Sequence, residues 1–132
     1  MFLKLLRNFN PETSHHISIL SLKYLSSFLE KTYKDEILNT SFGNLNFDNP
    51  IGIAAGYDKN AEVVDSLFKL GFGFVEVGTI TPLKQYGNPK PRVFRLVEDE
   101  ALINRLGFNN LGSKNVVDRI KSNKQTGLLG IN

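Results

Sequence analysis

The stretch from Asn49 to Lys59 constrains the fold most, because it changes within eleven residues from an apolar strand to small residues and then to charge. The run around Ile51, Ile53 and Ala54 is too short and too apolar for a strand with one wet face, and it is typical of a parallel strand covered on both faces. In α/β folds, ligands bind at the carboxyl ends of such strands. The stretch therefore predicts a buried strand that ends at a ligand site.

The residues that follow this strand support two interpretations. Gly52 and Gly56 lack side chains where another group must come close, and Ala55 adds little more. Asp58 and Lys59 then stand at the expected strand end, where they can serve a ligand. The same residues also fit an ordinary strand followed by an Asp that caps the next helix, and spacing alone does not separate the two interpretations.

Composition excludes several classes of function. The chain has 132 residues, which is enough for one small domain with a core. Its net charge of +3 comes from scattered residues and not from a dense basic run, and this argues against a nucleic-acid partner. Without cysteine there is no disulfide or thiol nucleophile, and two adjacent histidines make a metal site an unfavourable hypothesis. No stretch approaches the roughly 18 apolar residues of a membrane-spanning helix. Because the apolar opening also ends too early for a signal peptide, we expect a cytosolic chain that can still touch a membrane surface.

Two helices are predicted at the start of the chain. Residues 1–9 form a short amphipathic pattern with cationic flanks, and a second helix runs from about Pro11 to Glu30 behind the capping residue Asn10. This helix has two apolar stripes on nearly opposite sides, Ile17, Leu20, Tyr24 and Phe28 on one and Ile19, Leu22, Leu25 and Leu29 on the other. One core cannot bury both. Either the helix is sandwiched inside a larger protein or dimer, or one stripe enters a lipid headgroup boundary while the other covers an apolar passage.

The remaining chain alternates strands and helices. A hairpin over Thr40–Asp48 precedes the strand Ile51–Ala55, and the helix 61–71 then leads to the strand Phe74–Gly78. Strand, helix and strand at this spacing predict a right-handed βαβ unit. The second half is expected to hold a proline-rich loop over 82–91, a hairpin over 92–104, a Gly/Asn loop over 107–112, a helix over 113–123 and a strand over Leu128–Ile131. Three parallel strands without a closing partner leave a long apolar edge, so we expect that the chain is cut short.

Five motifs in this order resemble the dihydroorotate dehydrogenase family, namely Asn49–Lys59, Phe72–Thr79, Pro91–Arg95, Asn104–Gly112 and Gly130–Asn132. The resemblance implies an α/β fold consisting of an incomplete (β/α)8 TIM barrel, its first three strands only, preceded by a two-helix extension. Residues 1–38 would form that helical, membrane-associating extension, and residues 39–132 the first part of the FMN-binding barrel. The extension resembles the class 2, quinone-reducing branch, whose whole barrel needs about 250 residues.

The resemblance also implies an activity and a set of site residues. It predicts a flavoenzyme of pyrimidine biosynthesis that oxidises dihydroorotate to orotate on FMN and passes the electrons to a quinone. The residues matching FMN contacts are Ala55, Gly56, Tyr57, Asp58, Lys59, Thr79 and Asn132. Those matching substrate contacts are Lys59, Asn104, Arg105, Leu106, Gly107 and Phe108. His15, Phe94 and Arg95 match the lining of the quinone passage, and the family suggests a peripheral place on the cytoplasmic side of the cell membrane.

Two departures from the family pattern qualify the resemblance. Tyr57 stands where the family often has Leu or Phe, which affects the local packing. The family's catalytic base, a serine on a later strand, has no counterpart up to Asn132, so we assign no catalytic residue. A soluble branch that uses fumarate or a nicotinamide is disfavoured because it lacks the helical extension, and a non-catalytic binding fragment is the alternative from another class.

Overall fold

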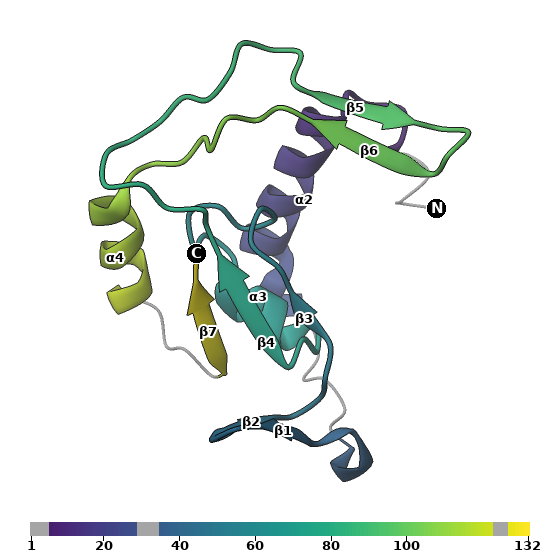
Figure 1. The fold of residues 1–132 in the computed structure, drawn as a ribbon. Helices are drawn as coiled ribbons and strands as arrows, with labels where there is room; N and C mark the ends of the chain where they lie inside the picture. Colours follow the sequence, from purple (N-terminus) through teal and green to yellow (C-terminus); the bar gives the residue numbers. More distant parts are fainter. Residues whose placement is uncertain (1–5, 29–34, 123–126) are drawn as a thin grey trace.

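A parallel sheet of three strands lies at the centre of the structure, in the order β3-β4-β7 (Figure 1). The computed structural model describes residues 6–28, 35–122 and 127–132. The strands are β3 (Gly52–Ile53), β4 (Phe74–Val77) and β7 (Leu128–Ile131), so the structure has a strand at each predicted place. β3 is shorter than the predicted strand, because beyond Ile53 the chain turns out of the ladder and Gly56 N bonds Gly78 O instead, at 2.9 Å.

Alternation along β4 divides the two faces of the sheet. Val75 and Val77 are fully buried and pack in the core with Val64, Leu67 and Val116 from the flanking helices. Phe74 and Glu76 point to the other face and are only partly buried. Within the described residues, helices therefore cover one face of the sheet, whereas the sequence predicted cover on both.

A side-chain cap marks the start of the longest described helix. α2 (Pro11–Leu25) starts behind Asn10, whose side chain accepts a hydrogen bond from Glu12 N at 3.0 Å, and it continues as the 3-10 turn η1 (Ser26–Phe28). α3 (Val64–Lys69) and α4 (Ser113–Ser122) complete the set among the described ranges. The predicted helix over 1–9 falls mostly outside the described residues, as do the last two residues of the predicted helix that reaches Glu30.

Only one of the two apolar stripes of α2 packs against the core. Ile19 is buried and Leu22 packs beside it, whereas Tyr24 is 70% exposed and Phe28 is 80% exposed. The sequence pattern placed Leu25 on the same stripe as Ile19 and Leu22, but Leu25 does not share their burial. Leu25 is exposed at the end of α2, beyond Leu22, the last residue of the helix that packs against the core.

Two hairpins lie at opposite ends of the sheet (Figure 1). β1 (Thr40–Phe42) pairs with β2 (Leu45–Phe47) after the short turn η2 (Glu36–Leu38), and the ring of Phe47 contacts that of Phe74 at 5.3 Å, near the start of β4. β5 (Val93–Leu96) pairs with β6 (Ala101–Asn104) beyond the carboxyl ends of the strands. Both predicted hairpins are confirmed.

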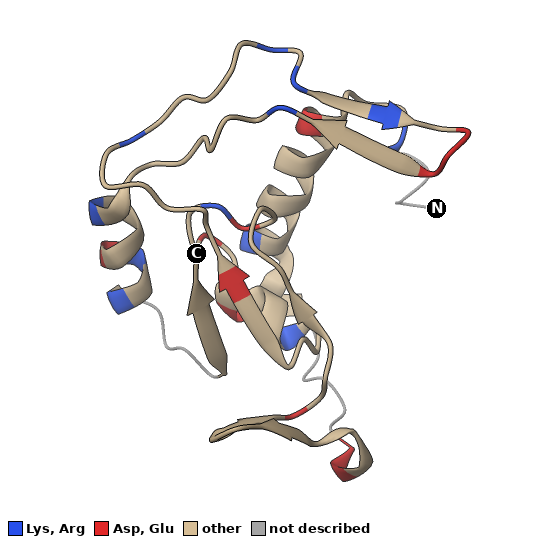
Figure 2. Ribbon diagram, in the orientation of Figure 1, with Lys and Arg blue, Asp and Glu red and all other residues tan. Residues whose placement is uncertain are grey.

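Charged residues are spread over several elements rather than gathered on one face. Figure 2 shows Lys and Arg on α4, β5 and the loop between β4 and β5, with acidic residues at the β5–β6 turn and at the end of β4. None of the helices in the described ranges has the length and apolar character needed to cross a membrane.

Candidate functional site

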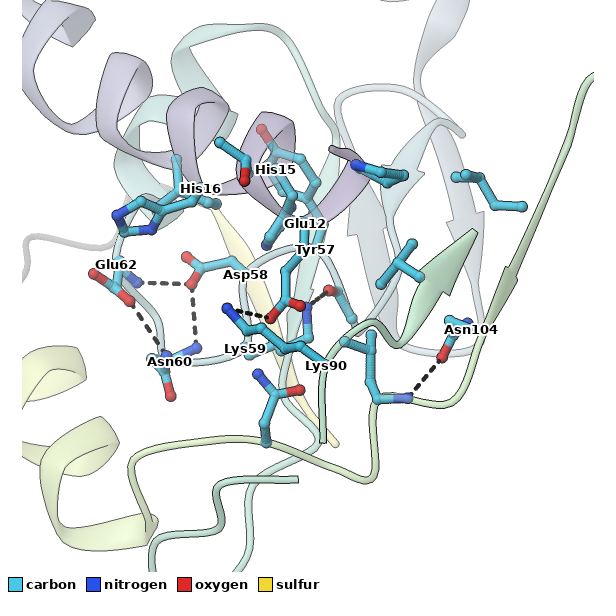
Figure 3. Close-up of a pocket in the computed structure, with 18 of the residues that line it drawn as sticks. Glu12, His15, His16, Tyr57, Asp58, Lys59, Asn60, Glu62, Lys90 and Asn104 are labelled. Atoms are coloured by element: carbon cyan, nitrogen blue, oxygen red, sulfur yellow. Dashed lines mark hydrogen bonds and ion pairs between the residues drawn. The ribbon is translucent and has the colours of Figure 1, made fainter. Parts of the chain in front are cut away.

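Two cavities meet at the carboxyl ends of the strands, one on each side of the loop Gly56–Lys59. The first, of about 590 Å³, lies between α2 and this loop (Figure 3). The second, of about 470 Å³, lies between the ends of β3 and β4 and the loop after β6. The residues that line both are Gly56, Lys59, Asn104, Leu106 and Asn109. Lys59 therefore supplies a cation to either cavity.

Lys59 is held in a partly dry position. Its Nζ donates a hydrogen bond to Gly56 O at 2.5 Å. Burial lowers the pKa of Lys59, and the nearby carboxylate of Glu12 opposes that shift. Because burial removes water from the ammonium group, its attraction for a bound anion is stronger here than at an open surface.

The second cavity unites two segments that the sequence assigned to different ligands. From the segments predicted to bind FMN and substrate, the lining includes Ala55, Gly56, Lys59, Thr79, Asn104, Arg105, Leu106, Gly107 and Phe108. Gly56 has a φ of 108°, and a Cβ placed there would meet no atom within 4 Å. A glycine at this point leaves open space over the backbone, where a flat ring can approach.

Asn132 lies outside the lining of both cavities but is tied to the second one. Its Oδ1 accepts a hydrogen bond from Thr79 Oγ1 at 2.5 Å, and its Nδ2 donates to Glu76 Oε1 at 3.1 Å. Glu76 Oε2 also accepts from Ala55 N at 3.5 Å. Glu76 was not predicted as a site residue, because its position in β4 is an ordinary strand position.

Asp58 holds the turn that precedes α3. It is 1% exposed, and its carboxylate accepts hydrogen bonds from Glu62 N and Val63 N, each at 2.8 Å. The helix begins at Val64 and not at residue 61 as predicted, and its N-cap is Val63, which makes no side-chain capping bond. Asp58 is therefore not the N-cap of this helix, while Lys59 does lie beside two cavities.

The lining of the first cavity includes His15 from α2 and Tyr57 from the loop, which lie side by side (Figure 3). Their rings meet edge to face with centroids 5.3 Å apart. Burial, and secondarily the charge of Lys59, lowers the pKa of His15 to about 4, so its imidazole is neutral at pH 7. Of the other two predicted passage residues, Arg95 lines this cavity and Phe94 lines neither.

Arg95 also fastens the start of the described chain to β5. Its guanidinium donates hydrogen bonds to Arg7 O at 3.0 Å, to Phe9 O at 2.6 Å and to Ser14 Oγ at 3.1 Å. These partners include two backbone carbonyls ahead of α2. The side chain therefore positions α2 at the mouth of the cavity.

A buried ion pair between Glu12 and Arg92 was not predicted. Arg92 Nη2 lies 2.6 Å from Glu12 Oε1, while Arg92 Nη1 donates to Tyr86 O at 2.6 Å and to Asn88 O at 3.1 Å. The hydrogen bond from Arg92 holds the pKa of Glu12 below its usual range. Arg92 belongs to the motif Pro91–Arg95 and Glu12 to the predicted helix, but no local pattern pairs residues 80 positions apart.

Other lining residues were also missed, namely Asn60, Gly78, Asn88 and Asn109. Asn109 belongs to the Gly/Asn loop that the sequence singled out, and its asparagines were the signal that could have extended the substrate segment by one residue. Among the residues that the structure describes, no group of three His, Cys, Asp or Glu side chains is placed to hold a metal ion.

Comparison with known proteins identifies the class to which this fold and these cavities belong. The family profile described as dihydroorotate dehydrogenase matches residues 37–132. The chain belongs to the dihydroorotate dehydrogenase family.

Similar sequences carry a more particular name. A Bartonella tribocorum protein named dihydroorotate dehydrogenase (quinone) is 53% identical over 123 residues, which cover 93% of this chain and 34% of that protein. A Rhodopseudomonas palustris protein with the same name is 52% identical over 131 residues, covering 98% of this chain and 36% of the relative. This chain thus spans about a third of the length of the curated relatives it matches.

Solved structures agree with the family assignment. The crystal structure of the Eimeria tenella enzyme in complex with ferulenol has a TM-score of 0.83 and 41% identity, covering 92% of this chain and 35% of that chain. Its ligand-free form has a TM-score of 0.81 and 40% identity. The mixed α/β architecture described here therefore fits part of the TIM-barrel fold of that family.

Proposed function

We propose that the full-length protein carrying this chain oxidises dihydroorotate to orotate on FMN and reduces a quinone, as a step of pyrimidine biosynthesis. The observation that supports this most directly is the position of Lys59 between two cavities. One cavity joins the predicted flavin and substrate segments, and the other lies under α2. Such an arrangement suits a reaction in which electrons enter on one side of a cofactor and leave on the other.

The residues around the second cavity fit a flavin. Ala55 and Gly56 offer an open backbone surface for a flat ring, Thr79 and the neighbouring Asn132 supply polar atoms, and Lys59 supplies a cation. These residues would hold FMN, which accepts the electrons from the substrate and delivers them to the acceptor. Asp58 would contribute through its place in the loop, since its carboxylate is taken up by amides.

The loop after β6 would bind the substrate. Asn104 Oδ1 accepts a hydrogen bond from Leu106 N at 3.4 Å, and Arg105 Nη2 donates to Pro91 O at 3.1 Å, which shapes the segment from Asn104 to Phe108. The carboxylate of dihydroorotate would pair with Lys59, whose partial burial strengthens the attraction. We assign the catalytic base to none of the described residues.

The cavity under α2 would receive the quinone. His15 and Arg95 line it, and Phe94 lies on the same hairpin as Arg95. The exposed apolar side of α2 would then rest in the headgroup boundary of the membrane, at the cytoplasmic face. In this proposal residues 1–38 form the membrane-associating unit and residues 39–132 the first part of the barrel.

The proposal is tested on the full-length protein in two half-reactions. We expect bound FMN at one per chain, bleaching of its absorbance by dihydroorotate without oxygen, and recovery of that absorbance on addition of a short-chain ubiquinone. Recovery with fumarate or a nicotinamide but not with the quinone would assign the protein to a soluble branch. A purified protein without FMN would contradict the proposal as a whole.

A further inference from the structure

A hydroxyl pair joins Tyr57, in the lining of the first cavity, to Ser18 on α2. Tyr57 Oη donates a hydrogen bond to Ser18 Oγ at 3.0 Å, and Ser18 Oγ donates in turn to His15 O at 2.7 Å. The pair joins residues 39 positions apart in the sequence, and both side chains are partly buried. It is a side-chain hydrogen bond from Tyr57, in the loop Gly56–Lys59, to α2, beside the ring contact of Tyr57 with His15.

The chain of donors leaves neither hydroxyl hydrogen free. The phenol hydrogen goes to Ser18 and the serine hydrogen goes to the carbonyl of His15, so a ligand in the cavity meets no spare donor from this pair. The hydroxyl bond instead fixes the direction of the Tyr57 ring. That ring forms the edge-to-face contact with His15 in the lining of the cavity.

The hydroxyl of Tyr57 is the group that makes this polar contact with α2. A Leu or Phe side chain at this position would carry no hydroxyl that could reach Ser18. A Phe ring could still pack edge to face against His15, but it would form no hydrogen bond to α2. In this chain the wall of the cavity is therefore held by a polar contact that neither residue could make.

We propose that the Tyr57–Ser18 hydroxyl pair sets the shape of the acceptor cavity, so that Ser18 is a positioning residue and Tyr57 a specificity-determining residue for the quinone. This inference rests on the proposed function. It adds that the hydrogen bond between Tyr57 and Ser18 holds α2 and the loop Gly56–Lys59 at the spacing that the acceptor requires.

The two hydroxyls are not equivalent, and this gives a sharp test. Removing the Tyr57 hydroxyl leaves Ser18 bonded to His15 O. The variant Tyr57→Phe therefore loses one hydrogen bond and leaves the Ser18 hydroxyl with its partner. Removing the Ser18 hydroxyl leaves the phenol of Tyr57 without its acceptor inside a partly dry cavity, which costs more. The double variant Ser18→Ala/Tyr57→Phe removes the phenol hydroxyl that Ser18→Ala leaves without an acceptor, so it should recover part of the quinone affinity that Ser18→Ala loses.

The experiment measures quinone reduction by the full-length enzyme and its variants with a short-chain ubiquinone, together with direct binding of that quinone to the oxidised enzyme by equilibrium dialysis. Ser18→Ala should raise the KM and the Kd for the quinone by about 3- to 10-fold, the size of one lost positioning bond. The rate at which dihydroorotate reduces the flavin should stay unchanged in Ser18→Ala. The double variant should lie closer to the parent than Ser18→Ala does.

Ser122→Ala is the matched control, because Ser122 Oγ donates to Arg119 O at 2.8 Å in the same helical geometry, and among the described residues no tyrosine is found to donate to it. It should leave the quinone KM and Kd unchanged. Equal quinone KM and Kd in Ser18→Ala and the parent, or a double variant worse than the sum of both single changes, would overturn the inference while leaving the proposed function intact. A parent enzyme that reduces no quinone would overturn both.

Discussion

At the scale of single residues, Lys59 is the side chain on which both proposed half-reactions depend. Its ammonium group is partly dry and bonded only to a backbone carbonyl among the contacts described, so it is available to negative charge in either cavity. We predict that Lys59→Ala in the full-length enzyme slows dihydroorotate oxidation about 100- to 1000-fold, the usual loss when an electrostatic stabiliser is removed from a site. The free energy of unfolding should change by about 1 kcal/mol or less, because no buried carboxylate loses its partner.

Stopped-flow reduction of the flavin and urea unfolding measure these two quantities on the same preparations. Lys114→Ala is the control, since Lys114 is exposed on α4, away from both cavities. If Lys59→Ala turned over dihydroorotate as fast as the parent enzyme, the electrostatic role proposed for Lys59 would be wrong.

His15 should make stability depend on pH in a defined window. Its pKa is about 4 in the folded protein and 6.5 in the unfolded reference, mainly because burial disfavours the charged ring. Between these values the unfolded chain binds a proton that the folded one does not, so this residue lowers stability as the pH falls from 6.5 to about 4. Above pH 6.5 both forms are neutral and the effect vanishes.

The variant His15→Gln should therefore flatten the dependence of the urea midpoint on pH within that window. His16→Gln is the neighbouring control, because His16 is exposed on the same helix, and it should keep the slope of the parent. If His15→Gln and the parent show the same slope, the buried position of the ring is wrong.

Sequence motifs predicted which segments come together at the strand ends, but they did not predict single contacts between residues far apart in the sequence. Lys59, Thr79 and the loop from Asn104 to Phe108 meet around one cavity, because strand order brings the carboxyl ends of β3 and β4 to the same edge. The partner of Tyr57 was not predictable. Ser18 is an ordinary helix residue, and only the tertiary packing of α2 places it beside the phenol.

At the scale of elements, the pair Glu12–Arg92 joins α2 to the loop before β5. The side chain of Arg92 is 7% exposed and that of Glu12 is 19% exposed, so the charges are largely removed from water. We predict that Glu12→Ala lowers the free energy of unfolding by about 3–5 kcal/mol, because Arg92 is left buried without its counter-charge. The loss should be measured by urea unfolding at pH 7.

Lys23→Ala provides the contrast for this prediction. Lys23 lies 3.8 Å from Glu62, with side chains 43% and 25% exposed, and such pairs contribute about 0–1 kcal/mol. The pKa of Glu12 is lower in the folded protein than its usual value of 4.5. Its contribution to the free energy of unfolding is therefore fully present above pH 4.5 and is lost as the pH falls through the pKa of the folded protein. Equal losses in Glu12→Ala and Lys23→Ala would contradict the buried pair.

The exposed side of α2 makes a second prediction at this scale. Deleting the first 30 residues should abolish quinone reduction and liposome binding, but Ile19 belongs to the core, so a deletion also exposes apolar surface elsewhere. Tyr24→Ser/Phe28→Ser changes only the exposed side chains and keeps the buried stripe. We expect it to weaken binding to anionic liposomes at least tenfold, since each buried apolar side chain is worth about 1.5–3 kcal/mol.

Liposome flotation and quinone turnover measure this prediction, with Val117→Ser on α4 as a control for loss of an exposed apolar side chain. The control should bind like the parent. Unchanged flotation of Tyr24→Ser/Phe28→Ser would favour the other explanation of the two stripes, in which α2 is covered by another protein surface.

Element boundaries show where sequence reasoning fell short. The hairpins, α4 and β7 were predicted nearly to the residue, because turns, caps and alternation mark them locally. α3 begins only at Val64 because the backbone before it is not helical, with φ of 54° at Ala61 and −136° at Val63. β3 keeps only two residues in the ladder, since the backbone bond from Gly56 to Gly78 draws the chain away. These are contacts between neighbours in space, which periodicity does not record.

At the scale of the whole molecule, the sheet has two open edges within the described residues. β3 and β7 each pair with β4 on one side only, and the face opposite the helices is not covered by any described helix. Parallel strands are normally buried on both faces and paired on both edges. The dihydroorotate dehydrogenase relatives, which are about three times as long, have further chain with which to complete such a sheet.

We predict that residues 1–132 expressed alone aggregate or remain insoluble, and that the soluble remainder binds FMN far below one per chain. Half of the cofactor's surroundings would be missing, and the open strands offer unpaired amides and carbonyls to other copies. The measurements are soluble yield, size-exclusion elution and flavin absorbance, with the full-length protein prepared in parallel as the control. A soluble monomer carrying stoichiometric FMN and turning over dihydroorotate would show that the two cavities described here already form a complete site, and that the open edges need no further strands.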